Sequence, residues 1–186
     1  KDSPQLFATL YAAFLIIGSF GVLALATFMP WIILVMPDNF RIAFQYVAPI
    51  SIATFLSFYY MIVSTGIFYS KQTKHISIAF GIAAIVSVAL NFVFVPYLNI
   101  WGTVISYIAA YCIALFMVFR KSQKLYYVPF SGIKMGWTIL WLIAATLGIV
   151  YIQLHDLNSW LILGVWIVFI LLVLLVRMDK YFVKRK

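Results

Sequence analysis

The sequence contains no glutamate and few charged residues of any kind. Charged side chains make up 9% of its 186 residues, whereas hydrophobic side chains make up 66%. A soluble domain of this length needs a much larger polar surface to enclose its core. The composition therefore argues against a soluble globular domain and predicts a chain that resides in a membrane.

Cysteine and histidine are also scarce. The single cysteine, Cys112, excludes a disulfide within the chain and lies in an apolar run, so we interpret it as a small packed residue. His75 and His155 fall at the ends of different apolar runs on opposite sides, so they cannot share a site. We therefore predict no metal and no cofactor.

Motifs for catalysis and for ATP-driven pumping are missing as well. The sequence has no Gly-rich phosphate loop of the GxxxxGK[ST] type, and its polar segments are too short for a catalytic domain. No ionisable side chain lies near the middle of an apolar run, where proton relays place them. His155 and Asp156 are adjacent, but no serine in a nucleophile motif accompanies them. We therefore expect that the chain is not an enzyme.

What the sequence does contain is six apolar runs of membrane-spanning length. About 20 mostly apolar residues cross a hydrocarbon core of about 30 Å. We expect a kink or a tilt at Pro49 in the second run. The predicted fold class is all-α, a polytopic membrane protein with six transmembrane helices. These helices are expected at residues 7–29, 42–69, 75–95, 100–119, 135–153 and 158–176.

The third and fourth spans depend on the stretch NFVFVPYLNIWGTVISY, residues 91–107. One helix over residues 75–119 would measure about 70 Å at about 1.5 Å per residue, which is too long for a single crossing. Pro96 disfavours a helical residue before it, so we expect the helix to end there. Asn99 tolerates a left-handed conformation. The prediction is a helical hairpin with its turn at residues 96–99.

The cations gather on one side of this predicted topology. Of the 13 Lys and Arg residues, all except Arg41 fall in segments that share the side of the amino terminus. This asymmetry is typical of the positive-inside rule, so we predict that both ends are cytoplasmic. The positive charge then indicates topology rather than nucleic-acid binding. The cations of the inner turns include Lys71, Lys74, Arg120, Lys121 and Lys124.

The second span carries a polar face, with cationic residues at both of its ends. Hydroxyl groups hydrogen-bond and aromatic rings stack on sugars, so this face suits a sugar chain with a phosphate anchor. The alternative is that the same groups hydrogen-bond between helices. The candidate cavity residues here are Arg41, Gln45, Tyr46, Ser57, Tyr60 and Ser64, which share the face with Ala53.

Small residues at four-residue spacing predict close packing of the third and fourth spans. Asn91 lies on the stripe of the third span, and an amide at membrane depth must find partners. It either bridges helices or faces a polar cavity, so it is a further cavity candidate. The last two spans are the most uniformly apolar, and we expect them to face lipid. The two stripes are Ser77, Gly81, Ala84 and Asn91, and Gly102, Ser106, Ala110 and Ala114.

The stretch NFVFVPYLNIWGTVISYIAAY resembles a helical hairpin of bacterial polysaccharide flippases of the O-antigen or capsular (Wzx) type. Asn99 departs from the family, which has glycine there, and Thr103 and Ala110 are milder departures. GIFYSKQTKHISI is similar to an inner turn of the family, and PWIILVMPDNFRIAFQYVAPISI to its short outer helix. The resemblance covers residues 5–125, and the last two spans only by topology. The matching hairpin residues are Asn91, Pro96, Ile100, Gly102 and Tyr111.

The resemblance implies the multidrug/oligosaccharidyl-lipid/polysaccharide exporter fold, with two six-helix lobes around a cavity and often two extra helices. Residues 1–125 would supply four helices of the C-terminal lobe. Residues 126–186 would supply the extra pair and a basic cytoplasmic tail. The N-terminal lobe, with any coupling carboxylate, would belong to a longer polypeptide.

The activity implied by the resemblance is alternating access that flips a polyprenyl-pyrophosphate-linked oligosaccharide across the bacterial inner membrane. The implied partners are this lipid-linked oligosaccharide, membrane lipids, the missing lobe and the polysaccharide polymerase machinery.

Two other interpretations stay open. A multidrug or peptidoglycan-precursor exporter shares the fold, although the latter is expected to carry more cavity cations than Arg41. A polytopic membrane enzyme of polysaccharide synthesis would need catalytic residues at the interface. The outer turns supply only Asp38, Arg41, His155 and Asp156 for that purpose.

Overall fold

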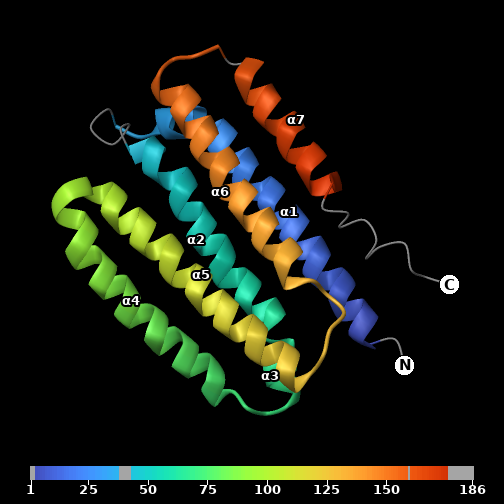
Figure 1. The fold of residues 1–186 in the computed structure, drawn as a ribbon. Coiled ribbons are helices and arrows are strands. Elements are labelled where there is room, and N and C mark those ends of the chain that lie inside the picture. Colours follow the sequence, from blue (N-terminus) through green and yellow to red (C-terminus); the bar gives the residue numbers. More distant parts are fainter. Residues whose placement is uncertain (1–2, 38–42, 159, 176–186) are drawn as a thin grey trace. The chain divides into compact units, whose positions relative to one another are not determined.

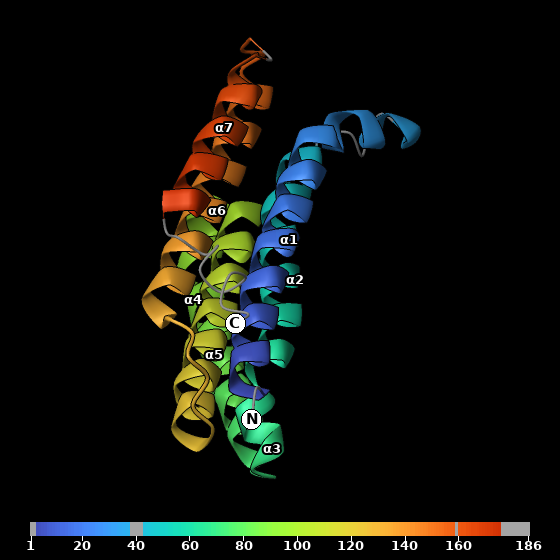
Figure 2. The same cartoon turned by 90° about the vertical axis from the view of Figure 1, so that its right-hand side faces the viewer.

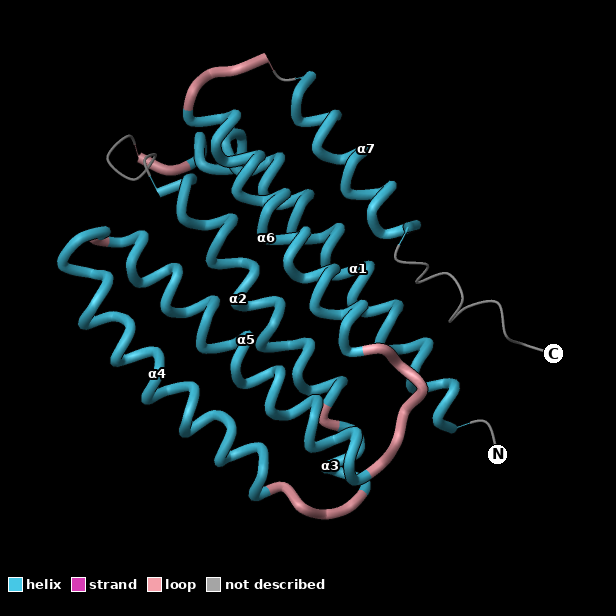
Figure 3. Tube along the Cα trace, in the orientation of Figure 1, coloured by secondary structure: helices cyan, strands magenta, loops and turns pink. Residues whose placement is uncertain are grey.

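The computed structural model describes residues 3–37, 43–158 and 160–175 as helices joined by short turns (Figure 3). No strand occurs among these residues, which confirms the all-helical prediction. In chain order the elements are α1 (Ser3–Ile32), the short 3-10 helix η1 (Ile33–Val35), α2 (Phe44–Val63), α3 (Thr65–Tyr69), α4 (Lys74–Leu98), α5 (Ile100–Leu125), α6 (Gly132–Leu154) and α7 (Trp160–Leu175) (Figure 1).

Five helical segments are long and apolar enough to cross a membrane. The sixth predicted span corresponds to α7, which is apolar but 16 residues long over its described part. About 20 residues are needed for a straight crossing, so length and composition together support a multi-pass membrane chain. The five segments are Pro4–Val35, Gln45–Tyr69, Lys74–Leu98, Ile100–Leu125 and Gly132–Leu154.

The chain divides into two compact units. The first unit contains Lys1–Tyr11 and Ala53–Phe130, and therefore the start of α1, the end of α2, and all of α3, α4 and α5. The second unit contains Ala12–Ile52 and Ser131–Lys186, and therefore the rest of α1 and α2 together with α6 and α7.

In the first unit, two tyrosines join the start of α1 to the end of α2. The Tyr11 hydroxyl donates to the carbonyl oxygen of Val63 over 3.2 Å. The Tyr59 hydroxyl donates in return to the carbonyl oxygen of Tyr11 over 3.1 Å. Both side chains are buried, and the ring of Tyr11 meets Phe130 edge-on at 5.7 Å between centroids. Because a buried hydroxyl needs a partner, this reciprocal pair ties the two helices together.

The second predicted span is interrupted at Ser64. Helix α2 contains Pro49, where we expect a kink or a tilt, and it continues through that proline to Val63. The hydroxyls of Ser64 and Thr65 donate to the carbonyl oxygens of Met61 and Ile62, over 2.7 and 2.6 Å respectively. Such side-chain bonds compete with the hydrogen bonds of the helix itself. The adjacent hydroxyl pair therefore marks the break between α2 and α3.

Helices α4 and α5 pack side by side as an antiparallel hairpin (Figure 1). The hairpin prediction is confirmed, but the helix does not end before Pro96 as we expected. Helix α4 runs through Pro96 to Leu98, and Asn99 alone separates it from α5. Proline is tolerated inside membrane helices, where the surrounding structure satisfies the freed backbone group. Asn99 has the expected positive φ of 49°, but its ψ of −127° differs from that of a left-handed helix.

The stripe of small residues predicted for α5 is confirmed, and the one predicted for α4 is wrong. Gly102, Ser106, Ala110 and Ala114 are all buried. On α4, however, the buried residues are Ala79 and Ala83, whereas Ser77, Gly81 and Ala84 are exposed. Small residues occur on several faces of α4, so their spacing alone could not select the face that packs. Ala83 forms one cluster with Ala110 and Ala114.

In the second unit, α6 contributes to the core and is not a purely lipid-facing helix. Its eight buried residues include Leu142 and Thr146. Helix α7 runs beside α6 and buries Phe169 alone among its described residues, as expected for a helix that faces lipid (Figure 2). Phe20 of α1 contacts both Trp166 and Phe169, with centroids 5.8 and 5.9 Å away. Most of the described residues of α7 are therefore exposed, whereas α6 is partly buried, so the expectation of a purely lipid-facing helix is wrong for α6.

Candidate functional site

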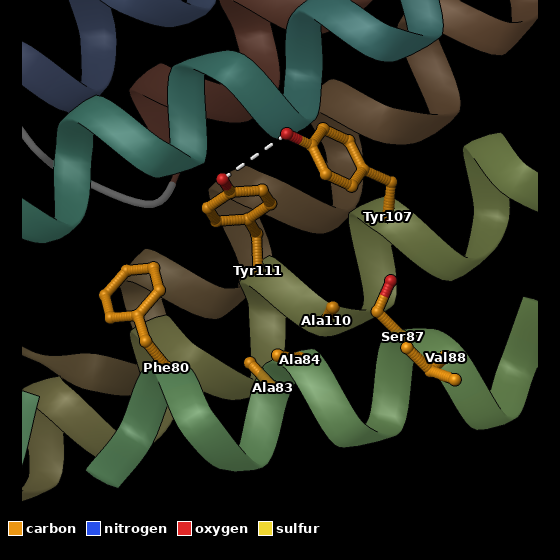
Figure 4. Close-up of a pocket in the computed structure, with 8 residues that line it drawn as sticks. All are labelled: Phe80, Ala83, Ala84, Ser87, Val88, Tyr107, Ala110 and Tyr111. Atoms are coloured by element: carbon orange, nitrogen blue, oxygen red, sulfur yellow. Dashed lines mark hydrogen bonds between the residues drawn. The ribbon is translucent and has the colours of Figure 1, made fainter. Parts of the chain in front are cut away.

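A pocket of about 300 Å³ lies between α4 and α5 in the first unit (Figure 4). This volume is at the lower end of the range for small-molecule sites, which is on the order of 300–1,000 Å³. Alanines form its floor, and aromatic and hydroxyl-bearing side chains stand around it (Figure 4). The lining residues are Phe80, Ala83, Ala84, Ser87 and Val88 of α4, and Tyr107, Ala110 and Tyr111 of α5.

Close packing of the hairpin creates this pocket. A Cβ atom added to Gly102 would lie 2.6 Å from the backbone carbon of Phe94, so only glycine lets α5 approach α4 there. Farther along the hairpin, Ala83 and Ala110 keep the helices close without filling the space between them. Larger side chains at these two positions would occupy the floor of the pocket.

Two tyrosines of α5 supply the polar side of the pocket. Tyr107 and Tyr111 are one helical turn apart, and their hydroxyl oxygens lie 3.4 Å from each other. Their rings meet edge-on, with centroids 5.0 Å apart. The Ser87 hydroxyl lies on the opposing helix (Figure 4). A phenol and an aliphatic hydroxyl can each donate and accept a hydrogen bond, so the pocket offers both roles to a ligand.

An aromatic chain connects the pocket to the end of α2 in the same unit. The ring of Tyr60 lies 4.5 Å from that of Phe80, and Phe80 lies 6.2 Å from Tyr111. Edge-on contacts of this kind are favourable and orient each ring. Tyr60 of the predicted face on α2 therefore contacts a lining residue of the pocket.

The other predicted cavity residues lie elsewhere. Arg41 is outside the described residues, and Gln45 and Tyr46 are half-buried in the second unit. Ser57 donates to the carbonyl oxygen of Thr54 over 2.7 Å, and Ser64 is buried with its hydroxyl on Met61. The hydroxyls of these two serines therefore donate within their own helix, so neither of these bonds is the bond between helices that the alternative expected.

Asn91 lies one turn beyond the pocket on α4. Its side-chain nitrogen donates to the carbonyl oxygen of Ser87 over 2.8 Å, and the residue is half-buried. This bond is made within α4, so the amide finds its partner without crossing to another helix. The link to Ser87 places Asn91 next to the pocket but not in its lining.

His155 and Asp156, two candidates of the enzyme interpretation, lie at the end of α6. The ring of His155 stacks on Tyr151 with centroids 4.1 Å apart, and its Nδ1 lies 3.0 Å from the carbonyl oxygen of Tyr151. Asp156 is exposed and has a positive φ of 47°. His155 thus caps the helix on which it lies.

Sequence reasoning missed most of the lining residues. The four-residue spacing of Tyr107 and Tyr111 was available as a signal, because it places both phenols on one face of a helix. Phe80 and Ser87 had no such signal, since their role depends on which face of α4 meets α5. That face was assigned incorrectly, and the serine that faces the pocket was overlooked with it.

Comparison of the chain with protein-family models, with curated proteins and with solved structures finds no match.

Proposed function

We propose that this chain is the C-terminal part of a bacterial inner-membrane transporter that flips polyprenyl-pyrophosphate-linked oligosaccharides by alternating access. The observation that carries the proposal is the hydroxyl-lined aromatic pocket between α4 and α5, two helices of membrane-spanning length. Sugars bring both hydroxyl groups and apolar ring faces to a binding site. Phenol side chains can bind both parts of a sugar, because their hydroxyl groups form hydrogen bonds and their rings stack on apolar faces.

The position of the pocket also supports this proposal. Ligand sites of transporters lie between helices within the membrane, where hydrogen-bonding groups are few and therefore selective. Tyr107, Tyr111 and Ser87 supply three hydroxyl groups around one space, and Tyr60 extends the aromatic surface toward α2. We assign the pocket to contact with one sugar of the carried chain, with the pyrophosphate bound elsewhere in the complete transporter.

The test is surface display of the polysaccharide in cells that depend on this transporter, expressed as its complete polypeptide. Tyr107→Phe together with Tyr111→Phe removes both phenolic hydroxyls and keeps both rings. Each lost hydrogen bond is worth about 0.5–1.5 kcal/mol, so we expect display to fall by roughly 5-fold to 150-fold for the pair. Tyr97→Phe is the matched control, because Tyr97 lies on α4 and is 82% exposed. Equal display by the pair and the control, at equal protein levels, would contradict the proposal.

A multidrug exporter is the second candidate, favoured by the aromatic cluster itself. Rings such as those of Tyr60, Phe80 and Tyr111 attract lipophilic cations through their π-electrons. In that case Phe80→Leu should sensitise cells to cationic drugs more than the double phenylalanine variant does. For the oligosaccharide carrier we expect the double phenylalanine variant to have the larger effect, measured on polysaccharide display.

A further inference from the structure

Two elements bring cations to one end of the first unit. Lys71 lies in the turn after α3, and Lys74 begins α4. The other three cations lie in the last turns of α5. We call this group the cationic rim: Lys71, Lys74, Arg120, Lys121 and Lys124.

Tertiary packing holds the two elements of the rim together. Ile67 of α3, Ala79 of α4 and Val118 of α5 form one buried cluster. Next to it, the backbone N–H of Gly66 donates to the Ser122 hydroxyl over 3.1 Å, and a Cβ atom at Gly66 would lie 2.6 Å from the Ser122 carbonyl oxygen. Figure 1 shows α3, the start of α4 and the end of α5 meeting at this end. These contacts join α3 to α4 and α5 next to the rim.

The rim has no acidic counterpart in the described part of its unit. Residues 3–11 and 53–130 contain neither aspartate nor glutamate. Four of the five cations are exposed, and Lys121 is half-buried. Lys121 of α5 lies within electrostatic range of His75, near the start of α4. Like charges held together at a surface raise the local potential and attract anions. An external anion would relieve this repulsion.

Aromatic side chains lie close to these cations along the chain, and one ring lies beside the Arg120 guanidinium. Phe68 and Phe116 are exposed, and the Arg120 guanidinium lies 5.5 Å from the centre of the Phe116 ring. The rings of Tyr69 and Tyr126 pack with centroids 5.1 Å apart. Aromatic rings beside cations are typical of the membrane interface, where rings lie at headgroup level and cations reach the phosphates. This mixture fits a lipid better than a soluble anion.

We propose that the cationic rim binds the phosphate groups of anionic phospholipids in the leaflet that it meets. The lysines of the α3–α4 turn and of α5 contact the headgroup from two sides, and the flanking phenylalanines contact the acyl chains. This site is separate from the pocket between α4 and α5, so the proposal does not depend on the transported substrate.

The test compares phosphatidylglycerol with phosphatidylcholine bound to the purified chain in mixed micelles, counted by native mass spectrometry. We expect the wild-type chain to retain phosphatidylglycerol preferentially. Lys71→Gln and Lys74→Gln should each weaken this preference roughly fivefold, and together roughly 25-fold. The matched control replaces the same two residues with arginine and should keep the preference, because the charge is retained. Both side chains are exposed, so all variants should unfold at the same temperature in zwitterionic micelles.

Two results would overturn this inference. One is an unchanged preference for phosphatidylglycerol in the double glutamine variant. The other is displacement of phosphatidylglycerol by inorganic phosphate at millimolar concentration, which would assign the rim to a soluble anion. Loss of the preference above about 1 M salt is expected, because the Debye length then falls to about 3 Å.

Discussion

A half-buried glutamine in the second unit compensates for a proline in a neighbouring helix. Pro30 lies inside α1 and has no N–H to donate to Ala26, four residues earlier. The Gln153 side-chain nitrogen donates to the carbonyl oxygens of Ala26 and Thr27, over 3.0 and 3.2 Å. The Trp166 indole N–H donates to the Thr27 hydroxyl over 3.0 Å. One amide therefore satisfies the backbone group that the proline leaves free.

We expect Gln153→Leu to lower the free energy of unfolding by about 1–3 kcal/mol, because it leaves a buried carbonyl without a partner. In a Pro30→Ala background the cost should be smaller, since alanine restores the N–H for Ala26. Gln5→Leu, at an exposed position on α1, is the control and should change little. Titration with SDS measures the free energy of unfolding of the wild-type chain, the two single variants, the double variant and the control. An equal cost of Gln153→Leu in both backgrounds would show that the amide does not serve the proline.

Close contact between α4 and α5 requires glycine at position 102 but not at position 81. Gly102 faces the backbone of Phe94, whereas a Cβ atom at Gly81 would meet nothing within 4 Å. Both glycines lie in helices of the same hairpin. The pair therefore separates the effect of contact between helices from the intrinsic effect of glycine within a helix.

We expect Gly102→Ala to destabilise the chain by about 1–3 kcal/mol, because the methyl group must push α5 away from the α4 backbone. Gly81→Ala should be neutral or stabilise by up to about 1 kcal/mol, since alanine is the better helix former. The thermal unfolding midpoints of the two variants in detergent provide the measurement. If both midpoints rise, the close approach at Gly102 is not needed.

At the scale of the whole chain, the exposed surface is rich in large apolar side chains. Ile85 and Phe92 of α4 are 71% and 79% exposed, and most of the described part of α7 is exposed and apolar. Such a surface would promote aggregation in water but is matched by lipid tails in a bilayer. Helix length, apolar composition and this exposure together support a multi-pass membrane protein.

The proposed topology predicts that the two ends of α4 lie on opposite sides of the membrane. In a Cys112→Ala background, Tyr97→Cys should react with an impermeant thiol reagent from outside the cell. Gln72→Cys, at the exposed turn before α4, should react only after the inner side is opened. Asn158→Cys should behave like Tyr97→Cys, because α5 and α6 each cross the membrane between these two positions. Labelling of Gln72→Cys and Tyr97→Cys from the same side would falsify this topology.

The elements of this protein were largely predictable because each depends on local chemistry. Apolar length marks the helices, and a chain of about 45 residues cannot cross a bilayer as one helix, so a turn near Asn99 was required. The end of α4 was misplaced by three residues. Proline removes one backbone hydrogen bond. In an apolar environment the helix continues through it, because an unfolded chain would leave more backbone groups without partners.

The pocket was not predictable, because it depends on how two helices are rotated about their own axes. Neighbouring residues on a helix point about 100° apart, so the choice between Gly81 and Ala83 as the contact decides whether Ser87 faces α5. Hydrophobic periodicity gives little guidance in a membrane helix that is apolar on every side. Likewise, nothing local revealed that Gln153 serves the proline of a helix more than a hundred residues away.

Composition and the order of charges thus determined that the chain is helical, suited to a membrane and divided by short turns. These properties follow from the free energy of transferring each residue between water and lipid. Packing alone settled which small residues carry helix contacts, and that Tyr107, Tyr111 and Ser87 face one space. The difference is physical. Solvation energies add along the chain, whereas close contact depends on the shapes of two surfaces at once.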